Sequence, residues 1–161
     1  MDTANTVGCD LAADVAGTFG RVCLRVSGTS MAPTLRPGDL LSVEAASIME
    51  VSLGEIVVFA REGGLIVHRV TIKTSSGGEL CLVTRGDRMR RHDAPISGPD
   101  LIGRVMHIDR GLSRIPALSR LNLAEQAICR MLRFSDRATY LYLYLTLRWN
   151  GPFLGRAVCR P

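Results

Sequence analysis

Short apolar segments separated by turn-forming residues fill residues 21–109, and this alternation constrains the fold more than any other feature of the sequence. The segments are rich in Val, Ile and Leu, and we expect strands at 22–26, 40–43, 56–60, 65–72, 80–84 and 101–108. Pro-Gly-Asp, Glu-Gly-Gly, Ser-Ser-Gly-Gly and Arg-Gly-Asp stand between them. Short strands bounded by Gly, Pro and Asp are typical of antiparallel sheets, so we predict a mainly β domain, coiled or barrel-like.

The last third of the chain differs in pattern and in charge. Apolar residues recur at helical spacing over 118–134, and a Tyr-Leu alternation and Trp149 follow. Residues 1–109 hold 11 basic and 13 acidic side chains, whereas residues 110–161 hold 9 basic and 2 acidic. We therefore predict an N-terminal segment at 1–20, a β domain at 21–110 and a basic amphipathic tail, helical in its first part, at 111–161.

Two features of the sequence bear on where the protein works. Segment 1–20 contains three aspartates and no basic residue, unlike a secretory signal peptide, and nowhere are about 18 apolar residues consecutive, as a transmembrane helix requires. The five cysteines form no CxxC pair or His/Cys cluster, so we expect thiols rather than a zinc site or a disulfide framework. The expected location is the cytoplasm or the surface of a membrane.

The stretch Ser27-Gly-Thr-Ser-Met-Ala-Pro-Thr-Leu35 is the richest in candidate chemistry. Ser30 follows a predicted strand in a compact turn, where a hydroxyl can be exposed beside backbone N–H groups that share an anion position. A serine hydroxyl needs a base at neutral pH, and the candidates are Lys73, His68, His92 and His107. His68 and Lys73 are five residues apart on one predicted strand, so their side chains point to opposite faces and at most one can reach Ser30.

Six segments occur in the order seen in type I signal peptidases, which are S24/S26 serine peptidases. They are the Ser27–Leu35 box, Pro-Gly-Asp39, Gly-Glu-Ile-Val-Val-Phe59, Ile-Val-His-Arg-Val70, Thr-Arg-Gly-Asp87 and Ile-Gly-Arg-Val105. The resemblance covers about residues 22–108. The His-Arg-Val block resembles the archaeal and endoplasmic-reticulum branch, in which histidine stands where the bacterial enzymes carry a lysine base. The family resemblance implies the signal peptidase/LexA-like coiled antiparallel β fold, a peptide or precursor-protein substrate, and neither cofactor nor metal.

The resemblance also implies roles for individual residues. Ser30 matches the nucleophile, His68 the general base and Asp93 the acid that orients the base. Asp87 matches a residue that shapes the turn, and it is the alternative acid. The residues expected to support the oxyanion and the loop are Gly28, Met31 and Pro33.

Three hypotheses about the function stay open at this point. The first is a serine endopeptidase of signal-peptidase type that cleaves a leader, signal or precursor peptide. The second is a self-cleaving LexA-like regulator, and the third is a non-catalytic module of the same fold. The tail could contact an anionic membrane surface through Tyr140, Tyr142, Tyr144 and Trp149, or pack on the β domain. No motif favours nucleic acid as a partner.

Overall fold

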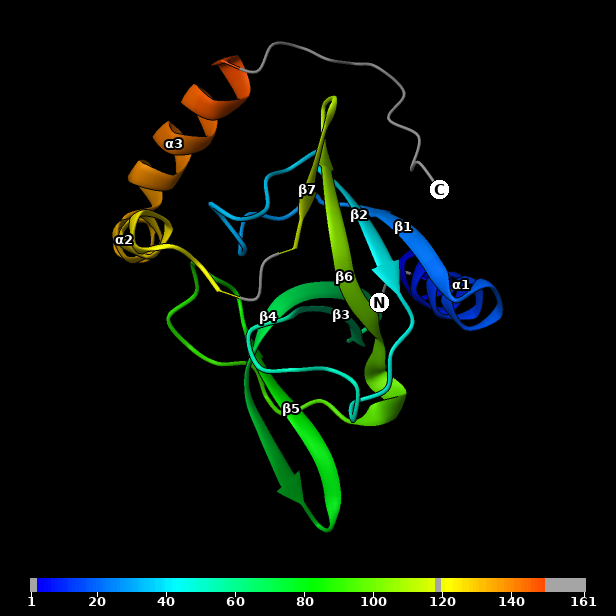
Figure 1. The fold of residues 1–161 in the computed structure, drawn as a ribbon. Coiled ribbons are helices and arrows are strands. Elements are labelled where there is room, and N and C mark those ends of the chain that lie inside the picture. The colour runs from blue at the N-terminus through cyan, green and yellow to red at the C-terminus, as the bar shows by residue number, and fades with distance from the viewer. Residues whose placement is uncertain (1–2, 118–119, 150–161) are drawn as a thin grey trace.

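The computed structural model describes residues 3–117 and 120–149, without the side chains of residues 3–9, 76, 136 and 147–149. Seven antiparallel strands form one strongly coiled sheet, with helices at both ends of the chain (Figure 1). The order within the sheet is β1-β2-β6-β3-β4-β5, and β7 pairs with β6. The strands are β1 (Arg21–Arg25), β2 (Leu40–Glu44), β3 (Ile56–Arg61), β4 (Gly64–Ser76), β5 (Glu79–Arg85), β6 (Leu101–Arg110) and β7 (Ser113–Pro116). The predicted mainly β domain is confirmed.

The turns lie at the Gly, Pro and Asp residues that separate the predicted strands. The β3–β4 hairpin turns through Glu62 and Gly63, whose φ angles are 53° and 74°. Two successive positive φ values match the right-handed twist of the flanking strands, and glycine adopts the second at no steric cost. The sheet bends at β-bulges, one of them between Val70 and Ile72, where β4 turns from its partner β3 to its partner β5.

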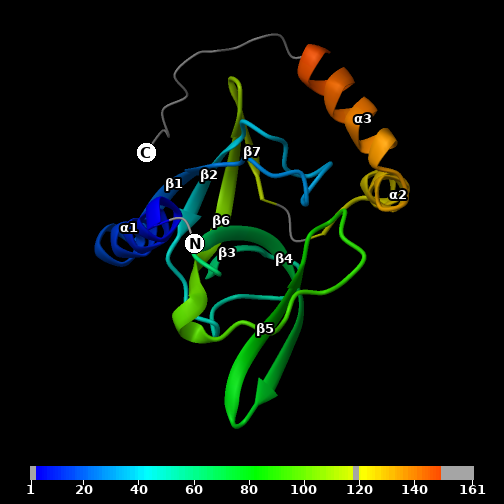
Figure 2. The same ribbon diagram turned by 180° about the vertical axis from the view of Figure 1, so that it is seen from behind.

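The helices lie on two sides of the sheet, as Figures 1 and 2 show from front and back. Helix α1 (Thr3–Phe19) packs on β1, β4 and β6, whereas α2 (Leu123–Leu132) and α3 (Asp136–Trp149) lie beside the loop that follows β5. A capping box at Asn122 and Glu125 starts α2. The basic tail is helical as predicted, but the Tyr-Leu alternation belongs to α3. The division of the chain at residues 20 and 110 stays a prediction.

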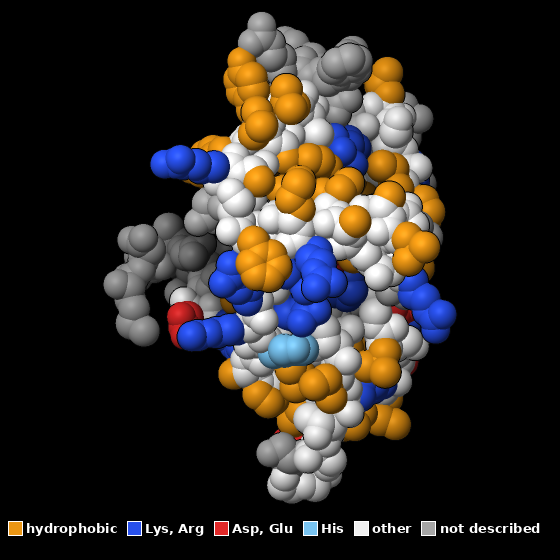
Figure 3. All heavy atoms as spheres, turned by 90° about the vertical axis from the view of Figure 1, so that its left-hand side faces the viewer, with side chains coloured by type: hydrophobic (Ala, Val, Ile, Leu, Met, Phe, Trp, Pro, Cys, Tyr) orange, Lys and Arg blue, Asp and Glu red, His pale blue; other side chains and the backbone are white. Residues whose placement is uncertain are grey.

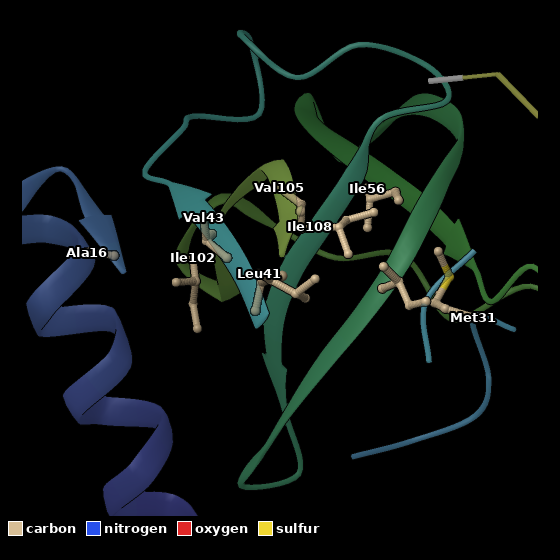
Figure 4. Close-up of a cluster of buried hydrophobic side chains, with 10 residues drawn as sticks. Ala16, Met31, Leu41, Val43, Ile56, Ile102, Val105 and Ile108 are labelled. Atoms are coloured by element: carbon tan, nitrogen blue, oxygen red, sulfur yellow. The ribbon is translucent and has the colours of Figure 1, made fainter. Parts of the chain in front are cut away.

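Two clusters of buried side chains form the core. The larger extends from Ala16 of α1 across the sheet to Met31 in the loop after β1 (Figure 4). The smaller surrounds Phe59, which is fully buried. Cys81 and Cys129 are free and buried, as expected for idle thiols. Cys23 is disulfide-bonded, so the expectation of thiols is wrong for this cysteine.

Candidate active site

The loop between β1 and β2 presents Ser30. Its neighbours Met31 and Pro33 are buried and fix the loop on the sheet. The turn closes through hydrogen bonds from the Ala32 N–H to the Thr29 carbonyl (3.1 Å) and from the Leu35 N–H to the Met31 carbonyl (3.0 Å). Ser30 remains half-buried, at the rim of a cleft of about 610 Å³. Its hydroxyl is therefore held in place and still accessible.

His68 lies on β4, opposite Val57 of β3, and its side chain is directed to Ser30. The Nε2 atom is 2.9 Å from the Ser30 Oγ, and the Nδ1 atom is 2.7 Å from Oδ2 of Asp93. The residue is 7% exposed, and its ring meets that of Phe59 edge to face at 6.3 Å between centroids. With the ring proton on Nδ1, His68 donates to Asp93 and accepts from the hydroxyl of Ser30.

Asp93 comes from the loop after β5, and Thr84 at the end of that strand holds it. The Asp93 N–H donates to the Thr84 carbonyl (2.8 Å), and the Thr84 hydroxyl donates to Oδ2 of Asp93 (2.6 Å). Thr84 is fully buried. The carboxylate therefore has a fixed direction before it meets the imidazole of His68.

Asp87, the alternative acid, serves a different contact. Its Oδ1 and Oδ2 accept hydrogen bonds from Nε and Nη2 of Arg69, both at 2.8 Å, and Oδ2 also accepts from the hydroxyl of Thr34. Arg69 and Asp87 are buried, at 8% and 4% exposure. This planar two-bond geometry is the strong form of an ion pair. It joins β4, the serine loop and the loop after β5.

The remaining candidate bases face elsewhere. The Lys73 Nζ donates to the carbonyls of Val51 at 2.6 Å and Met49 at 3.3 Å. The prediction that Lys73 and His68 lie on opposite faces is wrong, because the β-bulge between Val70 and Ile72 shifts the alternation of β4 by one residue. His92 is exposed and lies 3.0 Å from the hydroxyl of Thr71. His107 lies in register with Ser42 and Pro116 on neighbouring strands.

Gly86, between Thr84 and Asp87, approaches the serine and the histidine more closely than a side chain would allow. A Cβ atom at this position would lie 2.7 Å from the carbonyl oxygen of Ser30 and 3.0 Å from Nε2 of His68. The close approach brings the backbone of the loop directly under the serine and the histidine. Two residues further along, the N–H of Arg88 donates to the Ser30 carbonyl at 2.9 Å.

Several of these residues were not singled out by the sequence analysis. Thr84, Gly86 and Arg69 stand inside the Thr-Arg-Gly-Asp and His-Arg-Val segments, so a signal for them existed although no role was assigned. Thr34 likewise stands inside the serine box, and no role was assigned to it either. Within the described part of the chain, no group of three His, Cys, Asp or Glu side chains could hold a metal ion.

Comparison with known proteins places this chain in a family. A model described as Peptidase S24-like matches residues 9–106, which include Ser30, His68 and Asp93. The chain belongs to this family. The S24-like match therefore covers α1 from Cys9 onward, strands β1 to β5, and β6 as far as Met106, and it ends before α2 and α3.

Two fungal proteins are distant relatives of this S24-like chain. It is 39% identical over 92 residues to the signal peptidase complex catalytic subunit sec11 of Neurospora crassa, with 54% of each chain aligned. It is also 39% identical over 74 residues to the SEC11 subunit of Colletotrichum graminicola, with 44% of this chain and 43% of that protein aligned. The chain spans about half the length of the curated relatives that it matches.

Proposed function

We propose that this S24-like chain is a serine endopeptidase of signal-peptidase type that cleaves a leader, signal or precursor peptide. The observation that carries the proposal is the position of His68, whose two ring nitrogens lie 2.9 Å from the Ser30 hydroxyl and 2.7 Å from the Asp93 carboxylate. A hydroxyl, an imidazole and a carboxylate in this order form the arrangement that activates a serine nucleophile. In this proposal Ser30 is the nucleophile, His68 the general base and Asp93 the acid that orients it.

The proposed reaction follows from these contacts. As the Oγ of Ser30 bonds to the carbonyl carbon of the peptide, its proton moves to Nε2 of His68. The imidazolium, stabilised by Asp93, then gives that proton to the leaving amine, and the C–N bond breaks. Water, deprotonated by His68 in the same way, releases the acyl group from Ser30. The backbone N–H of Ser30 and a second donor near Gly28 would hold the oxyanion during both steps.

The cleft beside Ser30 suits an extended peptide. It lies between β1 and the first half of β4, and its apolar lining includes Leu24, Val26, Leu65 and Val67. In the described residues, the outer edge of β1 and residues 64–67 on the far side of β4 from β3 pair with no further strand. An exposed strand edge can add a peptide through backbone hydrogen bonds while alternate side chains enter pockets. The resemblance suggests small side chains just before the scissile bond.

A peripheral membrane contact through the tail is a second part of the proposal. Tyr140, Leu141, Tyr144 and Leu145 are all more than half exposed and recur at helical spacing on one face of α3, with Arg137 on the same face. Figure 3 shows hydrophobic side chains around a central group of Lys and Arg side chains on this side of the molecule. Aromatic and aliphatic side chains beside cations suit an anionic bilayer surface. Trp149 lies outside the described side chains, and no described helix is long and apolar enough to cross a bilayer.

The test of catalysis is cleavage of short peptides with Ala-x-Ala before the scissile bond, combined with labelling by a serine-reactive phosphonate. Ser30→Ala, His68→Ala and Asp93→Ala should each lower kcat by about 10⁴-fold or more. Lys73→Ala is the matched control and should keep wild-type turnover, because its ammonium group is bonded to the backbone carbonyls of Val51 and Met49.

Other outcomes would point to the alternatives. Loss of activity in Ser30→Ala and Lys73→Ala alone would favour the LexA-like Ser-Lys reading. A wild-type protein whose Ser30 reacts with no phosphonate would favour a non-catalytic module. For the tail, sedimentation with anionic vesicles should fall in a Tyr140→Ser, Tyr144→Ser double variant, and unchanged binding contradicts the membrane contact.

A further inference from the structure

The first turn of the loop after β5, residues 86–90, lies between the proposed catalytic residues and the tail helices. On one side, a Cβ atom at Gly86 would lie 2.7 Å from the Ser30 carbonyl oxygen and 3.0 Å from Nε2 of His68, and the Arg88 N–H donates to the Ser30 carbonyl at 2.9 Å. On the other side, the same five residues meet the junction between α2 and α3. The matched part of the family model ends at residue 106, so these helices lie outside the region that the family shares.

Arg133, the residue that caps the C-terminus of α2, makes the central contact. Its Nε donates to the backbone carbonyl of Asp87 at 3.0 Å. Arg90, in the loop, makes the reciprocal contact: its Nε donates to the carbonyl of Arg133 at 2.9 Å. The guanidinium of Arg90 also lies 4.6 Å from the ring centre of Phe134. A cation at the last carbonyls of a helix is favourable by charge as well as by hydrogen bonding. The loop and the helix therefore bind each other through two charged hydrogen bonds.

Two further contacts tie α3 to the same region. Nη1 of Arg88 lies 3.2 Å from the hydroxyl of Thr139, which is buried. Nη2 of Arg36, just past the serine box, lies 3.2 Å from the hydroxyl of Tyr142, and its guanidinium lies over that ring. Both loops of the proposed active site are thus held from outside by the tail.

The inner face of α2 is closely packed on this loop. Cys129 and Leu132 are 2% and 1% exposed. Burial, and next the negative charge of Asp87, raise the pKa of the Cys129 thiol to about 11, consistent with a short separation between α2 and the loop. Burial followed by the positive charge of Arg133 lowers the pKa of Arg85. The contact is desolvated around Cys129 and Leu132, and the hydrogen bond from Arg90 to Arg133 lies at its exposed edge.

We propose that Arg133 is a positioning residue for Ser30, which makes the tail helices a part of the catalytic unit rather than an appendage. Arg133 holds the carbonyl of Asp87, and the backbone from Gly86 to Arg88 in turn keeps Ser30 and His68 at reacting distance. The inference rests on the proposed function, because positioning matters only if Ser30 reacts. It assigns one arginine of the basic tail a role inside the molecule.

The test compares Arg133→Ala with Arg130→Ala in the full chain. Arg130 is the matched control, since it lies on the same helix, is exposed and makes no hydrogen bond or ion pair among the described residues that would be lost. Arg133→Ala should raise amide hydrogen exchange in residues 86–90 and slow phosphonate labelling of Ser30 by about tenfold, whereas Arg130→Ala should do neither. Guanidinium chloride at low millimolar concentration should restore labelling in Arg133→Ala, and sodium chloride at the same concentration should not.

The outcomes separate the inference from the proposed function. A wild-type protein that resists labelling contradicts the function itself. A labelled wild type with an equally reactive Arg133→Ala variant contradicts the positioning role, whether or not hydrogen exchange changes. If Arg133→Ala proves unfolded in a thermal melt, Arg133→Lys replaces it: labelling as fast as wild type would overturn the role, because an ammonium lacks the guanidinium Nε.

Discussion

The hydroxyl of Thr84 donates a 2.6 Å hydrogen bond to Oδ2 of Asp93, the same oxygen that lies 2.7 Å from Nδ1 of His68. The residues are nine positions apart, and the N–H of Asp93 bonds back to the Thr84 carbonyl. The carboxylate is therefore aimed from the end of β5. In the proposed triad, Thr84 acts on Ser30 only through Asp93 and His68.

Replacement of Thr84 by valine keeps the volume and removes the donor. We expect kcat on a cleavable peptide to fall by about tenfold with KM nearly unchanged, since a hydrogen bond to a charged group contributes on the order of 1.5–3 kcal/mol. Thr84→Ser, which keeps the hydroxyl, should recover most of the activity in the same steady-state assay. Equal kcat values for wild type and Thr84→Val would show that the hydrogen bond from Thr84 is not needed to orient Asp93.

The two aspartates should respond differently to the same change. Asp87→Asn leaves the buried Arg69 without a counter-charge, so the free energy of unfolding should fall by about 3 kcal/mol in urea denaturation. Asp93→Asn keeps an acceptor in a half-buried position and should lower stability by less than about 1 kcal/mol, while kcat falls by about 10⁴-fold because the imidazole is no longer held in the required tautomer. The opposite ranking would make Asp87 the acid.

Gly86 should tolerate no side chain. In Gly86→Ala the new Cβ would lie 2.7 Å from the Ser30 carbonyl oxygen, a backbone atom that cannot move cheaply. Overpacking of this kind costs about 1–3 kcal/mol, and displacement of Ser30 from His68 should lower kcat at least tenfold. Gly98→Ala is the control, because nothing lies within 4 Å of a Cβ there. Thermal unfolding and peptide cleavage, measured on both variants, check this, and a fully active Gly86→Ala would contradict the observed approach.

The thiol of Cys129 should react very slowly with thiol-specific reagents in the folded protein. Because burial raises its pKa from 9.0 to about 11, its thiolate fraction at pH 8 is about 100-fold below that of an ordinary thiol. An unfolded chain loses this proton near pH 9 and the folded chain near pH 11, so wild type should lose stability over that range relative to Cys129→Ala. Urea unfolding from pH 8 to 11 measures the difference, and a constant difference between the two proteins would oppose the assignment.

Local pattern was sufficient for much of the β domain. The strand expected at 22–26 is β1 at Arg21–Arg25, and the one expected at 101–108 is β6 at Leu101–Arg110. Apolar runs between Gly, Pro and Asp leave the backbone few alternatives to antiparallel pairing, which is why these predictions agree with the structure within a few residues. The short strand β7 was missed, because its four residues have no period of their own and pair only where β6 offers an edge.

The tail shows where local pattern misleads. A Tyr-Leu alternation has the period of a strand, yet residues 140–145 lie in α3. Thr139 and Leu143, four residues apart, form its buried side, so a helical period is present beneath the alternation. Packing on the loop at Arg88 and on Arg36 decides between the two.

The residues alone singled out Ser30 but left its base open among Lys73, His68, His92 and His107. The resemblance to the signal peptidases implied His68 and Asp93. Neither source gave the distances between these side chains, because 38 residues separate Ser30 from His68 and 25 separate His68 from Asp93. Those distances come from the pairing of β4 with β3 and β5, and from Arg69, which engages Asp87. Nor could a local pattern anticipate that Arg133, 46 residues beyond Asp87, holds its carbonyl. Such contacts exist only once strands and helices far apart in the chain share one desolvated interface.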